Sequence, residues 1–144
     1  MTTPFFNVVL DRNVSIGLVG SRAGFYDYED IGLCWIKSPV ATIGFRSCES
    51  RLCVHINVYR ISADYPIRDI ILSLNHVELQ YVPRIIDGNW AWLETQPFFC
   101  STLGDELSIE IPFLIPAAFR DPKTKESRRL GVALSGLVFK SAYA

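Results

Sequence analysis

The hydrophobic and polar positions of this chain alternate with a period of two. The clearest case is the segment 51–59, where four aliphatic residues alternate with Cys53, His55, Asn57 and Tyr59. In a β-strand, successive side chains point to opposite faces of the sheet. We therefore predict a strand here with one face in the core, and expect the other face to meet solvent or a groove.

Shorter apolar runs extend this pattern over the chain. They predict strands at 5–10, 14–19, 70–74, 77–82, 90–95, 107–111 and 130–140, and a turn followed by a strand at 36–45. Asn75-His76 separates two of these runs and suits a two-residue hairpin turn, because Asn tolerates positive φ. The segment 83–89 is predicted as a loop and 116–119 as one helical turn.

No apolar pattern of period 3.6 continues for three helical turns, whereas turn signals recur about every ten residues. A chain of 144 residues is long enough for one substantial core. We predict a single all-β domain over 1–144, an antiparallel β-sandwich of jelly-roll type with about eight strands.

Composition narrows the classes of partner. Hydrophobic residues make up 49% of the chain and charged residues 20%, and the net charge is −1. This balance argues against nucleic-acid binding, which needs a clustered excess of Lys and Arg. Every apolar run is shorter than the roughly 20 residues of a membrane span, so no membrane insertion is expected. The amino terminus has neither a basic start nor a long apolar stretch, and we expect a cytoplasmic protein.

Cysteine and histidine give no sign of a metal or cofactor site. Cys48 and Cys53 flank a predicted turn and could pair in an oxidising environment, but cytoplasmic thiols usually stay reduced. His55 and His76 form no metal-ligand spacing with each other or with the cysteines. No glycine-rich phosphate loop is present, so no cofactor is expected.

An acidic, aromatic stretch at 24–35 is the most distinctive part of the chain, and a basic segment at 126–131 has the opposite charge. We predict an ion pair between Glu29 and Arg128 or Arg129, because an arginine–carboxylate pair would tie the two segments together with charge-assisted hydrogen bonds. The alternative is that the carboxylates of this stretch bind sugar hydroxyls or a cation.

Aromatic residues provide the candidate ligand contacts. Trp35 is interpreted as a core residue, since Trp in a small β-domain is more often buried than exposed to ligand. Trp90 and Trp92 lie on one face of their predicted strand, next to a polar segment, and could stack on sugar rings. The candidate ligand-binding residues are Trp90, Trp92, Asp87, Asn89, Tyr26 and Asp27.

Three segments in order resemble a known family. Residues 24–35 are similar to its "GW-x-x-x-E-x-x-G-x-W" opening, with Phe25 in place of Trp. Residues 71–79 are similar to its central hairpin, with His76 in place of Gly. Residues 113–116 and 126–134 are similar to its closing "P…D-x-R-x-LG-x-x-L". The chain thus resembles small β-sandwich accessory modules of bacterial glycosyltransferases and other polysaccharide-assembly proteins.

This resemblance implies a non-catalytic, carbohydrate-binding module in bacterial polysaccharide biosynthesis, with a glycan or a glycosyltransferase as partner. A different reading is an assembly module that forms homo-oligomers through an apolar sheet face or open edge and has no small-molecule ligand. A third is a small enzyme that uses Cys53 and His55, which are two apart on one face of a predicted strand; it lacks an identifiable third group to orient the pair.

Overall fold

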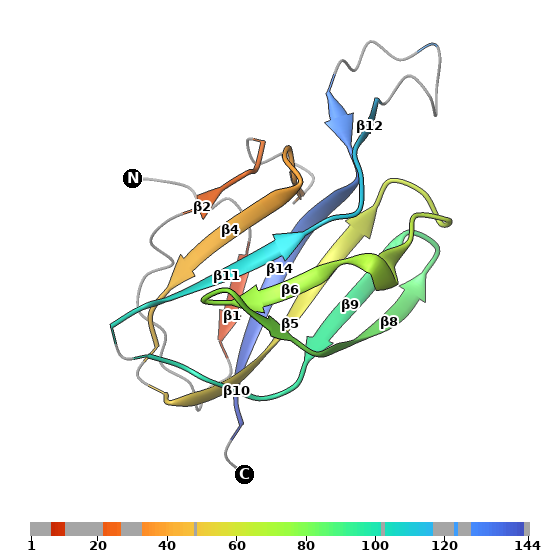
Figure 1. The fold of residues 1–144 in the computed structure, drawn as a ribbon. Coiled ribbons are helices and arrows are strands. Elements are labelled where there is room, and N and C mark those ends of the chain that lie inside the picture. Colours follow the sequence, from red (N-terminus) through yellow and green to blue (C-terminus); the bar gives the residue numbers. More distant parts are fainter. Residues whose placement is uncertain are drawn as a thin grey trace.

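Two β-sheets packed face to face make up the protein, as Figure 1 shows. The computed structural model describes residues 22–26, 33–47, 49–101, 103–116, 123 and 128–142, and the backbone alone of 7–10. The prediction of an all-β sandwich is confirmed.

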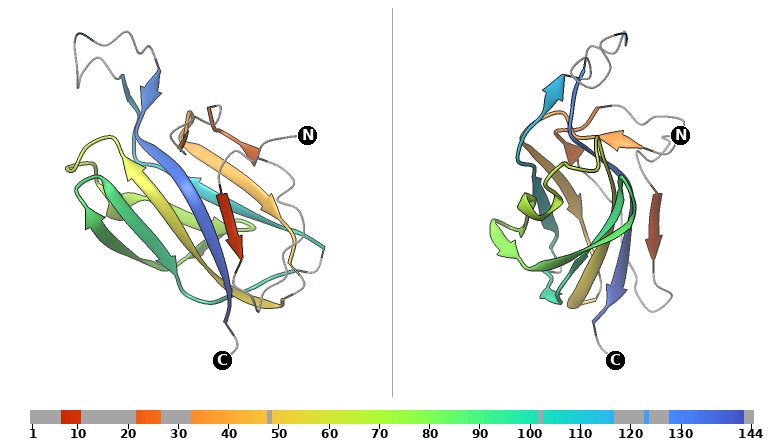
Figure 2. Two further views of the ribbon diagram at one scale, coloured as in Figure 1. Left: turned by 180° about the vertical axis from the view of Figure 1, so that it is seen from behind. Right: turned by 90° about the vertical axis from the view of Figure 1, so that its right-hand side faces the viewer.

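The larger sheet has seven strands. Along its main path the order is β1 (Asn7–Leu10), β14 (Val132–Ser141), β5 (Arg51–Arg60), β9 (Trp90–Thr95) and β8 (Tyr81–Asp87). Two short strands complete it, with β10 (Phe98–Phe99) paired to β5 and β3 (Cys34–Trp35) paired to β14. Strand β1 lies beside β14 in Figure 2 and runs parallel to it. The sequence predicted antiparallel strands throughout, and this one pair differs from that prediction.

The second sheet has five strands and covers the inner face of the first. Their order is β2 (Arg22–Ala23), β4 (Val40–Phe45), β11 (Asp105–Glu110), β6 (Ile71–Leu74) and β7 (Val77–Leu79). A separate ribbon of β12 (Ile115–Pro116) and β13 (Arg129–Leu130) extends past one end of both sheets, and a short 3-10 helix, η1 (Ile67–Asp69), precedes β6. The described strands outnumber the eight predicted, because several are two residues long and too short to create an alternating pattern.

The core lies between the two sheets and follows the alternation seen in the sequence. On β5 the four aliphatic side chains at 52, 54, 56 and 58 are fully buried, while the residues between them are half-buried. Ile43, Leu107 and Leu72 meet them from the second sheet and are also fully buried. Each fully buried aliphatic side chain contributes roughly 1.5–3 kcal/mol of transfer free energy.

The predicted hairpin at Asn75-His76 is confirmed. Both residues have positive φ, 49° and 70°, as a type I′ turn requires, and β6 pairs antiparallel with β7. The apolar run 77–82 was predicted as one strand, but it divides at Gln80. Its first part belongs to the five-stranded sheet and its second part begins β8 of the seven-stranded sheet, so the chain joins the two layers here.

The prediction of a loop at 83–89 is wrong, because β8 continues to Asp87 and a turn at Gly88 and Asn89 leads into β9. Pro83 suggested a loop, but β8 is an edge strand. The Gln80 carbonyl oxygen accepts a hydrogen bond from Gln96 N–H (2.9 Å), so even-numbered backbone positions face β9. Pro83 therefore faces outward, where its missing N–H breaks no ladder bond.

Two other predictions fall on residues that are not described. These are the strand at 14–19 and most of the helical turn at 116–119, of which Pro116 belongs to β12. Within the described part of the chain, no helix is long and apolar enough to cross a membrane.

Candidate functional site

The outer face of the seven-stranded sheet carries side chains in rows that cross the strands. Directly paired residues in a sheet project to the same side, so the register defines these rows. One row contains Trp35, Ala133, Tyr59 and Trp90. The next contains Gly136, Asn57, Trp92 and Arg84. The third contains Val138, His55, Glu94 and Val82.

The first row is a compact aromatic cluster with a structural role. Trp35 packs edge-on against Tyr59 with ring centroids 5.9 Å apart, and Tyr59 packs against Trp90 at 4.9 Å. Trp35 is only 7% exposed, so its predicted burial is confirmed. It lies on the outer face of the sheet, however, in a second cluster with Leu33 and Leu130, rather than between the sheets.

Tyr26 borders this aromatic cluster. Its N–H donates to the Trp35 carbonyl oxygen at 2.8 Å, and its ring packs against the cluster. The Arg128 guanidinium lies 5.2 Å from the centroid of the Tyr26 ring, in cation–π contact. This contact connects the segment around Tyr26 with the chain near Arg128.

The predicted ion pair at this end cannot be compared with the structure. Glu29 and Asp27 lie outside the described residues, so the pairing of Glu29 with Arg128 or Arg129 stays a prediction. Arg129 Nη2 donates to the carbonyl oxygen of Leu114, the residue just before β12, at 3.3 Å.

Residues of the second and third rows, together with Lys140, line an open cavity of about 470 Å³ on the outer face. We call it the Trp92 basin, and it is lined by His55, Arg84, Trp92, Glu94, Val138 and Lys140. These residues come from four neighbouring strands, β14, β5, β9 and β8. The basin thus combines a half-buried indole with a carboxylate and several nitrogen donors, a mixture that can bind a polar ligand with an apolar ring face.

Glu94 organises the charges in the Trp92 basin. Its Oε1 lies 2.8 Å from Arg84 Nη2, and its Oε2 lies 3.8 Å from His55 Nε2. Burial is the main cause that lowers the pKa of His55, and the charge of Lys140 lowers it further, against the opposing effect of Glu94. His55 is therefore mostly neutral at pH 7, with one ring nitrogen available as an acceptor and the other as a donor.

Asn57 lies beside Trp92 in the second row. Its Oδ1 is buried and has no hydrogen-bond partner among the described residues. A buried acceptor without a partner costs about 1–3 kcal/mol. Among the described residues, Asn57 Oδ1 is the one buried side-chain oxygen or nitrogen atom without a hydrogen-bond partner.

Two of the predicted ligand contacts belong to the β8–β9 turn instead of the basin. Asn89 Nδ2 donates to the Arg60 carbonyl oxygen, and Arg60 N–H donates to the Asn89 carbonyl oxygen, both at 2.9 Å. The Arg60 guanidinium donates to Gly88 O at 2.9 Å and to Tyr65 O at 3.1 Å. Asn89 thus holds the turn in place, while Asp87 is exposed at the end of β8.

Of the predicted ligand residues that the structure describes, Trp92 alone lines the basin. The sequence placed Trp90 on the same strand face, which is confirmed, but its ring packs against Tyr59 in the aromatic cluster. Sequence reasoning missed Arg84, Glu94 and Lys140 as members of one site. The alternation of polar and apolar residues shows which face of its own strand each residue lies on. Only the register between strands shows that the three residues are neighbours on one face of the sheet.

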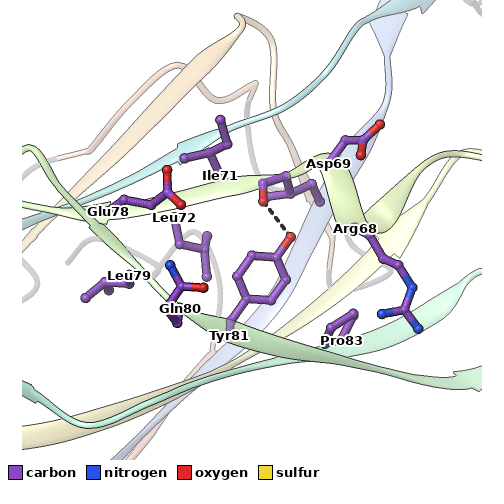
Figure 3. A pocket seen from close by; sticks show the side chains of 10 residues that line it. Arg68, Asp69, Ile71, Leu72, Glu78, Leu79, Gln80, Tyr81 and Pro83 are labelled. Carbon is purple, nitrogen blue, oxygen red and sulfur yellow. Dashed lines mark hydrogen bonds between the residues drawn. The ribbon is translucent and has the colours of Figure 1, made fainter.

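A second cavity, of about 430 Å³, lies where β6, β7 and β8 meet (Figure 3). Tyr81 extends into it, and its hydroxyl lies 2.5 Å from the Ile70 carbonyl oxygen and 3.1 Å from that of Ile67. Burial, followed by the charge of Asp69, raises the pKa of Tyr81 to about 12. The Tyr81 hydroxyl therefore stays protonated as a donor that attaches η1 to β8, which is a structural role.

The cysteine–histidine pair considered above lies on the outer face of β5. Cys53 and His55 are both half-buried there, whereas Cys48 lies outside the described residues. Burial and the charge of Asp105 raise the pKa of Cys100 to about 12, so this thiol is not a nucleophile at pH 7. The described residues contain no group of three or more His, Cys, Asp or Glu side chains that could hold a metal ion.

Comparison of the chain with models of known protein families found no match. A search of curated proteins also found no significant relative. The resemblance to accessory modules of glycosyltransferases therefore stays a prediction from the sequence.

Proposed function

We propose that this protein is a non-catalytic carbohydrate-binding module, and that the Trp92 basin is its binding site. The observation that supports it most is the half-buried Trp92 indole, next to a carboxylate and nitrogen donors in a cavity of about 470 Å³. A sugar ring has an apolar C–H face and a rim of hydroxyls, and this combination of side chains complements both.

Each lining residue has a role in this proposal. The sugar's C–H face stacks on Trp92, while Glu94 accepts a hydrogen bond from one hydroxyl. The exposed Arg84 guanidinium, held by Glu94 at 2.8 Å, donates to a second hydroxyl. Neutral His55 both donates and accepts, so it suits a hydroxyl in either orientation.

The sequence resemblance supports a biological setting for this binding. It suggests a bacterial module that works beside a glycosyltransferase in polysaccharide biosynthesis, and we propose a cytoplasmic location for it. A module of this kind holds the growing or acceptor glycan and performs no bond chemistry itself, so no cofactor is part of the proposal.

A glycan array followed by calorimetric titration of the best ligand tests this proposal. Trp92→Ala should weaken binding at least about tenfold, because stacking on one aromatic ring is lost. Phe99→Ala is the matched control, since Phe99 is 73% exposed on β10 and does not line the basin. Binding that survives Trp92→Ala, or no binding to any glycan on the array, would overturn the proposal.

A second candidate function, self-association, is favoured by edge strand β8. Val82, Ile85 and Ile86 are 61%, 45% and 53% exposed there, and an exposed apolar edge is a site for strand pairing. Pro83 and the register shift between Ile85 and Asp87 oppose such pairing, because the first removes an outward donor and the second bends the edge.

Sedimentation at rising protein concentration tests self-association. Ile86→Lys should dissociate any dimer formed through β8, whereas Leu103→Lys, at an 84% exposed position away from β8, should leave it intact. A stable dimer of this kind should bury more than about 1,000 Å². A monomer at all concentrations would exclude this function.

A further inference from the structure

The charges that line the Trp92 basin are unbalanced. Arg84 and Lys140 are cations, Glu94 is the one acid among the lining residues, and His55 is mostly neutral at pH 7. The basin therefore carries a net charge of about +1, although the whole chain has a net charge of −1. A concave surface with a net charge concentrates ligands of the opposite sign.

The excess positive charge is located on Lys140. The Arg84 guanidinium is matched by Glu94 at 2.8 Å, across the β8–β9 pair. Lys140 lies on β14, on the far side of β5, and takes part in no ion pair among the described residues. Its side chain is half-buried, so its charge is less screened by salt than that of a fully exposed lysine.

The positions of Lys140 and Trp92 suit one elongated ligand. The two residues come from strands separated only by β5, and neighbouring strands are about 4.8 Å apart. His55 on β5 lies between them and provides a neutral hydrogen-bonding group. A chain of sugars that stacks on Trp92 can thus extend over β5 and reach the ammonium group.

We propose that the ligand of the Trp92 basin is an acidic glycan, whose sugar carboxylate pairs with Lys140 while a neighbouring ring stacks on Trp92. This inference rests on the proposed carbohydrate-binding function. In this proposal Glu94 weakens binding of the acidic glycan, because its carboxylate repels the ligand's charge even though it holds Arg84 in place. Neutral sugars of the same shape would bind without the contribution of Lys140.

The test compares uronic-acid oligosaccharides with their methyl esters, which keep the sugar rings and lose the charge. Short oligomers of galacturonate, glucuronate and mannuronate are titrated calorimetrically into the full chain at low ionic strength. At least one acid should bind about tenfold more tightly than its ester, and raising the salt concentration should reduce this ratio.

Single-residue variants locate the charge effect. Lys140→Gln should weaken binding of the acid about fivefold, the effect of one partly exposed charge pair, and leave the ester unchanged. Glu94→Gln should strengthen binding of the acid, because repulsion is removed while an acceptor is kept. Lys37→Gln makes the same charge change at an exposed position outside the basin and should have no effect.

The outcomes separate this inference from the proposed function. Equal affinity for acid and ester, with dependence on Trp92, would overturn the acidic ligand and leave carbohydrate binding in place. No binding of any acid or ester would overturn this inference, while the glycan array decides carbohydrate binding separately. Equally tight binding of polyglutamate, with no dependence on Trp92, would show a simple polyanion surface and overturn the inference. A Lys37→Gln effect equal to that of Lys140→Gln would overturn the assignment to the basin.

Discussion

The two faces of strand β5 differ sharply, although their residues alternate along the same ten positions. The inner face has four fully buried aliphatic side chains that pack against the second sheet. The outer face has Cys53, His55, Asn57 and Tyr59, all half-buried and each paired across the sheet with an aromatic or charged residue. One face therefore supplies stability, while the other positions side chains that can meet a ligand.

The outer face itself divides into two regions. Around Trp35 the rings pack against one another, and the partly buried Tyr59 and Trp90 surround the buried Trp35 as in a small core. Around Trp92 the neighbours are charged and a cavity is present. The difference teaches that an outward-facing tryptophan in this sheet can be structural or accessible, depending on the row in which it lies.

The largest expected effect tests the structural region. Trp35→Ala should lower the free energy of unfolding by about 3 kcal/mol, because it removes a large ring that is only 7% exposed and leaves a cavity beside Tyr59. Urea denaturation followed by circular dichroism measures this. A loss below about 1 kcal/mol would mean that the aromatic cluster is not a second core.

A smaller effect is expected from the one polar side chain of β9 that faces the core. Thr95 Oγ1 accepts a hydrogen bond from Val54 N–H at 2.9 Å, where direct pairing of β5 with β9 ends. Thr95→Val keeps the shape and leaves a buried donor unpaired, so it should cost about 1–3 kcal/mol. Thr95→Ser, which keeps the hydroxyl, is the control for the same urea measurement and should lose less.

Trp92→Ala should change stability by less than about 1 kcal/mol, since its ring borders an open cavity rather than a packed cluster. The same variant should weaken glycan binding at least about tenfold, in contrast to Trp35→Ala. If Trp92→Ala destabilises the fold as much as Trp35→Ala does, the two regions of the outer face are not distinct.

The smallest effect concerns pH. Because the pKa of His55 is below 6.5 in the folded protein, the unfolded chain binds more protons in the window between the two pKa values. The free energy of unfolding should therefore keep its full value above pH 6.5 and decrease as the pH falls through that window. His55→Gln should remove this part of the pH dependence in thermal melts between pH 5 and pH 7.5. An unchanged profile would mean that His55 is not desolvated.

Protonation of His55 should also act on the ligand. The groups that face this imidazole are Glu94 on β9, Arg84 on β8, Lys140 on β14 and Cys53 on its own strand. At low pH the added positive charge should strengthen binding of an acidic glycan and leave a neutral one unchanged. Titrations of the acid–ester pairs at pH 5.5 and 7.5 measure this difference.

Local patterns in the sequence were sufficient to predict several elements. The alternation in β5 and β9 reports directly which residues are buried, and Asn75-His76 has the backbone preference of its turn. The segment 83–89 was misread because Pro83 and Gly88 are also loop residues. Only the edge position of β8 makes Pro83 compatible with a strand, and that position is a property of the whole fold.

The candidate site was harder to predict from the sequence, because it too depends on how the strands are arranged in the whole fold. Arg84, Glu94 and Lys140 are ordinary charged residues within their own strands. They form one basin because β14, β5, β9 and β8 are neighbours in a particular register, and their order in the sheet does not follow their order in the chain. Trp35 likewise gave a correct prediction of burial, but its side of the sheet depends on pairing with Ala133.

All three tryptophans lie on strands of the seven-stranded sheet, and none belongs to the five-stranded one. Intrinsic fluorescence therefore observes one layer of the molecule selectively. The Trp92 indole should report ligand arrival, whereas those of Trp35 and Trp90 should report loosening of their cluster. Events confined to the opposite layer would leave the emission almost unchanged, which makes the protein a naturally labelled system for separating the motions of its two sheets.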